Sequence, residues 1–213
     1  MLYYDLFENA GLFENLQDML DALAADEPFC NEMRAVMPLL LKGQNSYEKP
    51  DNSNLSEFPL KLHGVYTKAQ IQVAIGTSTL NHKSSSREGV ERNKNLNVEA
   101  MYVDIIKDRE IGSSTDYDDT ALTPDLFQWD TQNRVRPDSN EGKAYIEKKH
   151  TMLLFVREQK TFPEDKYRTM GYVYLGRVEL NSWEYKNLGS RMQMQIIWKM
   201  LEAIPGSVMH YAR

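Results

Sequence analysis

The chain has 213 residues, of which 41% are hydrophobic and 26% charged, and it carries a formal net charge of -6. This length can bury an ordinary core, as one large domain or as one domain with a small appendage. No apolar run approaches the roughly 18 residues that cross a bilayer, and no basic segment precedes the first apolar residues. We therefore expect a cytoplasmic globular protein without a membrane partner.

The charges are unevenly distributed along the chain. Residues 1–60 hold 11 acidic and 3 basic residues, a net charge of -8, whereas the remainder holds 20 acidic and 22 basic residues, a net charge of +2. Proteins neutralise nucleic-acid phosphates with Lys and Arg. The acidic first part is unsuited to that role, whereas the second part tolerates a phosphate backbone if a few cations are well placed.

Apolar residues recur at helical spacing in the acidic part. The pattern predicts a packed helix from Gly11 to Ala24 and a second helix from Pro28 to Leu41, which Pro38 kinks or stops early and Gly43 ends. The only cysteine, Cys30, lies in the second helix and is expected to be a small buried residue. The two helices predict an acidic hairpin, which is either a packing unit or a docking surface for other subunits.

A polar stretch without periodicity, residues 44–58, predicts a linker. It divides the chain into an acidic helical segment with its linker, residues 1–58, and a second domain, residues 59–213. In the second part, Thr67 and Gln70 have the spacing of a capping box, which predicts a short helix through Ile75 with Gly76 as its stop.

From Asn97 onward the apolar period changes to two, which predicts strands. Ser139 is placed to cap a helix over residues 140–149. Further strand patterns occupy residues 119–122, 126–132, 151–158, 171–180 and 192–200. We expect an α+β fold with a small, curved, mostly antiparallel sheet or an open β-barrel.

Residues 115–133 read TDYDDTALTPDLFQWDTQN and place an acidic turn beside a strand. In that strand Phe127 and Trp129 share one face, which we expect in the core. Leu126, Gln128, Asp130 and Gln132 share the other face, and its polar members can line a cleft.

A loop with Tyr117, Asp118 and Asp119 precedes this strand. A Tyr ring can stack on a base, and a carboxylate can accept a hydrogen bond from an exocyclic amine. The alternative is a turn in which the acidic side chains cap backbone groups.

Catalytic patterns are weak. Asp125 and the Glu141-x-Lys143 triplet have the residue types of a metal-dependent nuclease, but Glu141 falls at a helix start and other Glu-x-Lys triplets occur. The histidines lack the spacing of a zinc site, and no glycine-rich phosphate loop is present. We expect no catalytic residues, no metal and no cofactor, and we keep a metal-dependent nuclease as a third hypothesis.

Several motifs occur in a specific order. They are REGV at 87–90, the Lys107 segment, T-x-Y-x-D at 115–119, LFQWDTQN at 126–133, LFVRE at 154–158 and YVYLG at 172–176. In this order they resemble a bacterial domain of once-unknown function, which usually lies at the C-terminus of DEAD/DEAH-type helicases, often with a phospholipase-D-type nuclease at the other end. The resemblance covers about residues 59–205, and the ordered set is more specific than any one motif.

The resemblance implies a function. Family members with nuclease and helicase parts resemble modification-dependent restriction systems, and the domain is similar to SRA-like readers of modified cytosine, with an SRA/PUA-like fold and a base-flipping pocket. The usual F-H-W-Q-S-Q motif has Gln128 in place of its His and Asp130 in place of its first Gln. The expected DNA-binding residues are Arg87, Lys107, Thr115, Tyr117, Asp118, Asp119, Gln128 and Gln132.

The leading hypothesis is a non-catalytic DNA-binding domain of a restriction or phage-defence system. It would read methylated or hydroxymethylated cytosine and recruit or license a helicase-nuclease. The expected partners are modified duplex DNA and helicase and nuclease domains, in cis or in trans. The alternative is a protein-interaction or regulatory module of a DEAD/DEAH-type helicase that reads no base.

Overall fold

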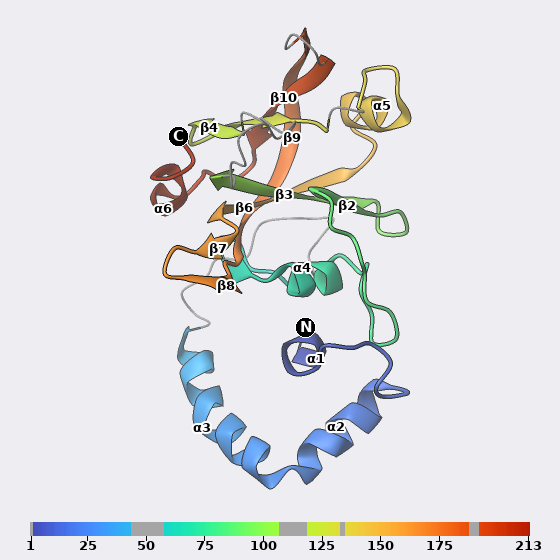
Figure 1. The fold of residues 1–213 in the computed structure, drawn as a ribbon, viewed down its shortest axis with the longest axis vertical. Helices are drawn as coiled ribbons and strands as arrows, with labels where there is room; N and C mark the ends of the chain where they lie inside the picture. Colours follow the sequence, from blue (N-terminus) through green and yellow to red (C-terminus); the bar gives the residue numbers. More distant parts are fainter. Residues whose placement is uncertain (1, 44–57, 107–118, 133–134, 188–191) are drawn as a thin grey trace.

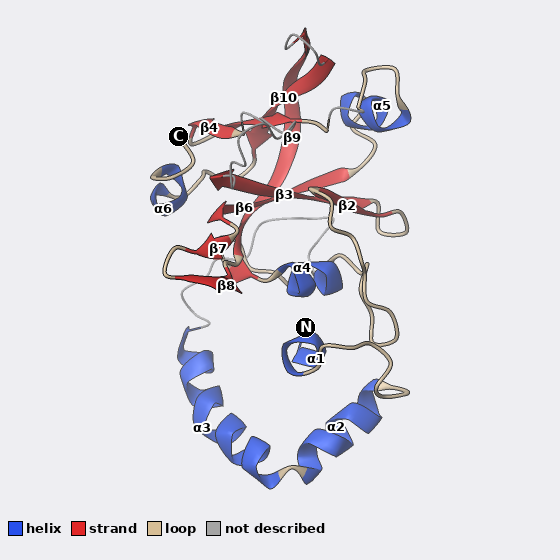
Figure 2. Cartoon of the chain, viewed as in Figure 1, coloured by secondary structure: helices blue, strands red, loops and turns tan. Residues whose placement is uncertain are grey.

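The computed structural model describes residues 2–43, 58–106, 119–132, 135–187 and 192–213, and they form an α+β structure (Figures 1 and 2). The helices are α1 (Leu2–Leu6), α2 (Leu16–Ala25), α3 (Glu27–Gly43), α4 (Lys68–Ala74), α5 (Asn140–Ile146) and α6 (Gly206–Met209). The strands are β1 (Val65–Tyr66), β2 (Val90–Asn93), β3 (Val98–Ile106), β4 (Thr120–Thr123), β5 (Leu126–Asp130), β6 (Thr151–Gln159), β7 (Thr161–Phe162), β8 (Asp165–Thr169), β9 (Tyr172–Asn187) and β10 (Met192–Met200).

The main sheet is mixed and open. Its strand order is β2-β3-β6-β9-β10-β5-β4, with β1 paired to β9, while β7 and β8 form a separate hairpin. All described strand pairs are antiparallel except β3 and β6. The chain between these two parallel strands carries β4, β5 and α5. The predicted α+β class and mostly antiparallel sheet are therefore confirmed.

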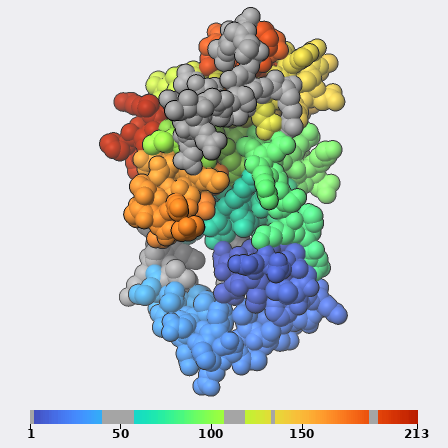
Figure 3. Space-filling view, in the orientation of Figure 1, coloured from blue at the N-terminus to red at the C-terminus, as the bar shows by residue number. Residues whose placement is uncertain are grey.

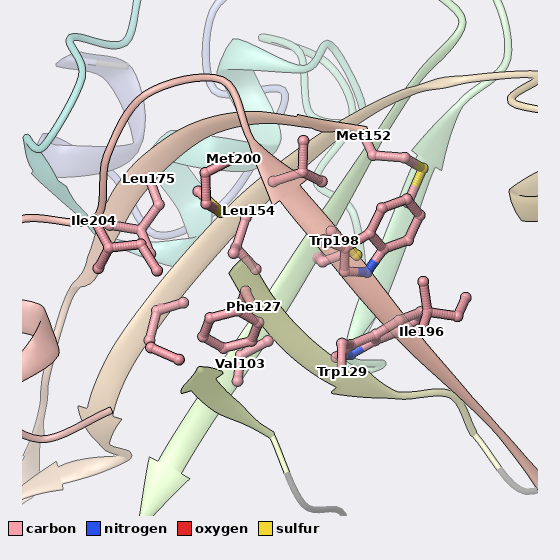
Figure 4. Close-up of a cluster of buried hydrophobic side chains, with 14 of the residues drawn as sticks. Val103, Phe127, Trp129, Met152, Leu154, Leu175, Ile196, Trp198, Met200 and Ile204 are labelled. Atoms are coloured by element: carbon pink, nitrogen blue, oxygen red, sulfur yellow. The ribbon is translucent and has the colours of Figure 1, made fainter. Parts of the chain in front are cut away.

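The parallel strands β3 and β6 are buried on both faces. In β3, Met101 and Val103 belong to one apolar cluster, which also contains Phe127 and Trp198 (Figure 4). Ala100 and Tyr102 belong to a second cluster on the opposite face, which α4 covers with Ile71 and Ile75. The alternation predicted from Asn97 onward therefore separates two cores rather than a core from solvent, as is usual for parallel strands.

The long strand β9 joins the two halves of the sheet. It pairs with β6 and with β10, and its register with β6 shifts beside Gly176. Gly176 has a φ of +93°, and a side chain there would approach Leu62 to 3.0 Å. A residue with a side chain would be strained at this bend, so glycine permits the strand to curve.

Local helix signals in the domain are confirmed. The Thr67 side chain accepts a hydrogen bond from the Gln70 backbone N–H, and the Gln70 side chain accepts one from the Thr67 backbone N–H. Gly76 follows with a φ of +73°. Ser139 caps α5, although this helix ends at Ile146, earlier than expected. The helix starts could be predicted because each depends on residues a few positions apart.

Helix α1 contacts the domain. The Tyr4 hydroxyl donates to the backbone oxygens of Thr79 and His82, at 2.8 and 3.0 Å. The Gln70 amide donates to Asp5 at 2.9 Å. These hydrogen bonds fix α1 against the region of α4 and the loop that follows it, and α2 and α3 extend beyond it (Figure 1).

Half of the described apolar stripe on the two predicted helices is exposed. Met19 is buried, at 3% exposure, and Phe13, Leu23, Phe29 and Met33 are half-buried, whereas Leu12, Leu16, Leu20, Val36 and Met37 are exposed, as is Leu39 beside the stripe. The prediction of packed helices is therefore wrong for the exposed half of the stripe. Two helices alone bury little more than the seam between them.

Helix α2, the first of the two predicted helices, begins later than predicted, at Leu16 rather than Gly11. Gly11 has a φ of +75°, which is incompatible with a right-handed helix, and Asn15 caps α2 by accepting a hydrogen bond from the Asp18 backbone N–H at 3.0 Å. Cys30 is half-buried rather than buried, and its thiol donates to the Leu23 carbonyl oxygen at 3.5 Å. Helix α3 does not stop at Pro38 and continues to Gly43.

None of the helices in the described part of the chain has the length and apolar character needed to traverse a bilayer.

Candidate functional site

A cleft of about 920 Å³ opens on the domain. One side is formed by the start of α4 and by residues 86–90, and the other by the base of the β7–β8 hairpin. In Figure 3 the hairpin (orange) and the green segment that contains residues 86–90 stand on either side of a hollow. The ends of β3, β5, β6 and β9 also line the cleft. Strands far apart in sequence thus contribute to one site.

An ion pair lies in this cleft. The Arg157 guanidinium donates from Nε to Asp104 Oδ1 at 2.6 Å and from Nη2 to Asp104 Oδ2 at 2.9 Å. Its third nitrogen, Nη1, donates to the Met170 carbonyl oxygen at 3.1 Å. The guanidinium also lies 4.2 Å from the centre of the Tyr172 ring. Each Arg157 nitrogen therefore has a partner, and the residue acts as a fixed wall.

Lys68 also lines the cleft. Its Nζ is 4.5 Å from the centre of the Tyr102 ring and donates to the Glu88 backbone oxygen at 3.0 Å. Burial lowers the pKa of Lys68 because it disfavours the ammonium form. The Glu88 carboxylate accepts a hydrogen bond from the Gln132 side-chain amide at 3.1 Å. Residues 86–90 are thereby held at the cleft.

Aromatic rings give the cleft its apolar surface. Tyr102 and Tyr172 meet edge to face at 5.4 Å, and Trp129 lines the same cleft. Burial raises the pKa of both tyrosines, so their phenols stay neutral at ordinary pH. The site therefore combines neutral aromatic side chains, two of them in contact with cations, with the carboxylates and amide near the end of β5.

The predicted DNA-binding residues are partly brought together. Arg87, Asp119 and Gln132 line the cleft. Gln128 is half-buried within β5 and does not line it. The other four, Lys107, Thr115, Tyr117 and Asp118, lie outside the described residues.

Asp119 has a backbone partner. One of its carboxylate oxygens accepts a hydrogen bond from the Asp130 backbone N–H at 2.9 Å. This agrees with the alternative that acids of this turn cap backbone groups. Asp130 is itself 5% exposed and accepts a hydrogen bond from the Gln195 amide at 3.1 Å. The two carboxylates are thus held in place at the edge of the cleft.

The expected aromatic faces are confirmed. Phe127 is 0% and Trp129 6% exposed, and both belong to the first core cluster. Trp129 meets Tyr145 edge to face at 5.6 Å and lies 6.3 Å from Trp198 (Figure 4). Trp129 therefore has two roles, since it packs in the core and lines the cleft.

Sequence reasoning missed the other half of the cleft: Lys68, Tyr102, Asp104, Arg157 and Tyr172. A signal was available in the strands. Asp104 and Arg157 are charged residues within mostly apolar strands, and such residues need a partner when they are buried. Their pairing across strands some fifty positions apart could not be inferred from local pattern.

A second polar cluster lies apart from the cleft. The Tyr145 hydroxyl donates to Glu99 Oε1 at 2.8 Å, and His150 Nδ1 is 3.2 Å from Glu99 Oε2. Burial raises the pKa of Glu99, against the opposing hydrogen bond from Tyr145. Burial, with Arg92 and Lys149 nearby, lowers the pKa of His150. A cavity of about 190 Å³ beside it shares no lining residue with the cleft.

Within the described ranges, no group of three or more His, Cys, Asp and Glu side chains could hold a metal ion. Asp125 lies in the β4–β5 turn and Glu141 in the first turn of α5, and both are exposed.

The model of a family described as a domain of unknown function, DUF3427, matches residues 60–212. The chain belongs to the DUF3427 family. The matched region contains every residue that lines the cleft, whereas α1, α2 and α3 precede it. The cleft is therefore a feature of the DUF3427 domain itself. A comparison with curated proteins found no match.

Proposed function

We propose that this DUF3427 domain is a non-catalytic DNA-binding domain that holds a modified cytosine in the cleft. The base would be methylated or hydroxymethylated and turned out of the duplex. In the proposed setting, a bacterial restriction or phage-defence system, binding recruits or licenses a helicase-nuclease in cis or in trans. The observation that carries the proposal is the combination, in one cleft, of aromatic side chains with groups that can recognise the edge of a base.

The chemistry of a flipped cytosine fits these groups. A flipped base is held by stacking and by hydrogen bonds to its Watson–Crick edge. Tyr102, Tyr172 and Trp129 offer apolar surface. The carboxylates of Asp119 and Asp130 can accept from the exocyclic amine of cytosine, and the Gln132 amide can donate to its ring acceptors. Both kinds of polar group stand at the end of β5.

The charge of the cleft also supports a nucleotide. Arg87, Lys68 and Lys160 contribute cations to its walls. They can approach the phosphates that flank an extruded nucleotide, and such contacts position the strand without reading sequence. The volume of about 920 Å³ is at the upper end of the range for small-ligand clefts. It leaves room for the base together with its sugar and phosphate.

The test is an equilibrium titration of the whole chain against three matched duplexes, with unmodified, methylated or hydroxymethylated cytosine at one position. We expect tighter binding to one modified duplex. Equal affinity for all three would overturn base reading, and absence of binding at low salt would overturn DNA binding altogether. Because the salt concentration sets the affinity, all titrations use the same buffer.

A second candidate function is a protein-interaction or regulatory module of a DEAD/DEAH-type helicase. It is favoured by the exposed apolar side chains on α2 and α3, which lie among acidic residues. A contiguous exposed apolar surface often marks a protein interface. This candidate would replace the first if the chain binds none of the duplexes. Substituting Leu16 and Leu39 with Glu would then be expected to weaken co-purification with the helicase.

A further inference from the structure

The β7–β8 hairpin projects from the domain with little packing of its own. Every residue of β8 is exposed, and β7 is only half-buried. At the centre of β8, Tyr167 is 87% exposed, the largest value among the described large hydrophobic side chains. A tyrosine ring held in water adds nothing to the core, and its exposure suggests a binding role.

The hairpin is attached to the cleft. Its two ends meet where the Met170 backbone N–H donates to the Lys160 carbonyl oxygen at 3.0 Å. Lys160, Thr169 and Met170 line the cleft, and the Met170 carbonyl oxygen accepts from Arg157 at 3.1 Å. The base of the hairpin is therefore fixed to the guanidinium of the buried ion pair. Whatever occupies the cleft lies beside this hairpin.

The two sequence neighbours of Tyr167 in β8 are cations that contact aromatic rings of the hairpin. Lys166 Nζ lies 5.2 Å from the centre of the Tyr167 ring, and the Arg168 guanidinium lies 4.6 Å from that of Phe162. Among the described residues, no carboxylate forms an ion pair with Lys166 or Arg168. The Asp165 side chain accepts a hydrogen bond from the Tyr167 backbone N–H at 3.0 Å. This bond holds the strand in the conformation that presents the ring.

An exposed ring on a hairpin that also carries two cations matches one chemistry well. Proteins that hold nucleic-acid strands use aromatic rings for bases and Lys or Arg for phosphates. We propose that the β7–β8 hairpin is a second nucleic-acid contact, in which Tyr167 stacks on a base adjacent to the one in the cleft and Lys166 and Arg168 contact its phosphates. This inference rests on the proposed function. In this proposal the hairpin contributes to the overall affinity for DNA, whereas the cleft discriminates between bases.

The experiment compares Tyr167→Ala, Tyr167→Leu and Tyr167→Phe with wild type, using methylated and unmodified duplexes. We expect Tyr167→Ala to weaken binding to both duplexes by about 5- to 150-fold, the loss for one stacked base, with the ratio of affinities unchanged. Tyr167→Phe should retain binding because it keeps the ring. Tyr167→Leu should behave as Tyr167→Ala, since it keeps apolar area without a stacking face.

The cations are tested by salt dependence. The double substitution Lys166→Ala/Arg168→Ala should make the slope of log affinity against log salt shallower by about 1 to 2, because each contact to a phosphate contributes about 1. Lys94→Ala/Lys199→Ala is the matched control, since both lysines are exposed and neither lines the cleft. It should leave the slope unchanged.

The outcomes separate the two proposals. If wild type binds duplex DNA and Tyr167→Ala binds equally well, the hairpin inference fails and the proposed function stands. If Tyr167→Ala weakens binding to the modified duplex alone, the inference also fails, because Tyr167 would then read the base. If wild type binds no duplex, both fail. The melting temperature of each variant should match wild type, since Tyr167 is exposed.

Discussion

Asp104 and Arg157 are direct partners in the register of the parallel strands β3 and β6. The pairing places the carboxylate opposite the guanidinium, where two hydrogen bonds of 2.6 and 2.9 Å join them. The Arg157 side chain is 8% exposed and that of Asp104 29%. The fold therefore fixes a charged pair in the cleft by strand register alone, and the pair in turn holds the base of the β7–β8 hairpin.

Removing the carboxylate should destabilise the fold. Asp104→Ala leaves the buried Arg157 guanidinium without its counter-ion, which we expect to lower the free energy of unfolding by about 3 kcal/mol. Urea denaturation measures the change. Asp125→Ala, at an exposed turn, is the control and should stay within about 0.5 kcal/mol of wild type. Equal stability of Asp104→Ala and wild type would show that solvent compensates Arg157.

Features that depend on neighbouring residues could be predicted from the sequence, whereas this ion pair could not. The strand pattern of residues 192–200 and the capping box at Thr67 depend on neighbours within a few positions, and both were predicted correctly. Of the residues that line the cleft, the sequence predicted Arg87 and two members of the stretch 119–132, Asp119 and Gln132. Asp104 and Arg157 meet through strand order, which no local period encodes.

The length of β9 shows a second limit of strand prediction from sequence. The expected strand ends at Leu180, whereas β9 continues to Asn187. Residues 181–184 are exposed, and residues 182–184 pair with β10 through the backbone without burying their side chains. Strand prediction from periodicity detects burial, so it misses a segment held by hydrogen bonds alone. The strands β1 and β7 were missed because two residues are too few to show a period, and β8 was missed because all its residues are exposed. The four-residue strand β2 was also missed.

Trp129 should be essential for stability. It is 6% exposed and packs against Tyr145 and Trp198. We expect Trp129→Ala to lower the free energy of unfolding by about 3 to 5 kcal/mol, through lost burial and the cavity that remains. Trp129→Phe should lose less because it keeps an aromatic ring. Chemical denaturation of both variants checks the order, and a stable Trp129→Ala protein would contradict the assignment of this ring to the core.

The Glu99 and His150 pair should make stability depend on pH. The pKa of His150 is lowered from its ordinary 6.5, so below pH 6.5 the folded protein binds fewer protons than the unfolded chain. Its contribution to stability is present above pH 6.5 and is lost as the pH falls. The pKa of Glu99 is raised from 4.5, so its effect has the opposite sign, and stability falls as the pH rises above 4.5 through that window.

Single substitutions separate the two effects. Between pH 7.5 and 5.5, His150→Gln should lose less stability than wild type, because the lowered pKa of His150 no longer contributes. Glu99→Gln should lose more stability than wild type. It lacks the carboxyl group whose protonation in the folded state favours folding as the pH falls. Urea denaturation at both pH values provides the comparison. If His150→Gln shows the same decline as wild type, another group causes it.

DNA binding should depend only modestly on salt. The chain after residue 60 carries a net charge of +2, so few phosphates can be neutralised. We expect a slope of log affinity against log salt between about -2 and -5. Titrations from low to physiological salt measure it. A slope near about -10 would require a basic surface that the sequence does not supply.

Gln132 should determine discrimination between bases. Its amide lines the cleft and donates to Glu88, so it is held in position to donate to a base. Gln132→Ala should reduce the preference for cytosine over thymine at the flipped position, measured as a ratio of affinities, by a factor that corresponds to about 1 to 3 kcal/mol, the typical value of one specific pair of contacts. Stability should change little, because Gln132 is only half-buried and lies beyond the end of β5.

Asp119→Ala should reduce the same ratio of affinities. It should also lower the free energy of unfolding by about 1 kcal/mol, because the Asp119 carboxylate accepts a hydrogen bond from the Asp130 backbone N–H. Gln128→Ala, within the same strand but outside the cleft, is the matched control and should leave the ratio unchanged. If Gln132→Ala and Asp119→Ala both preserve the ratio, the base is read by other residues.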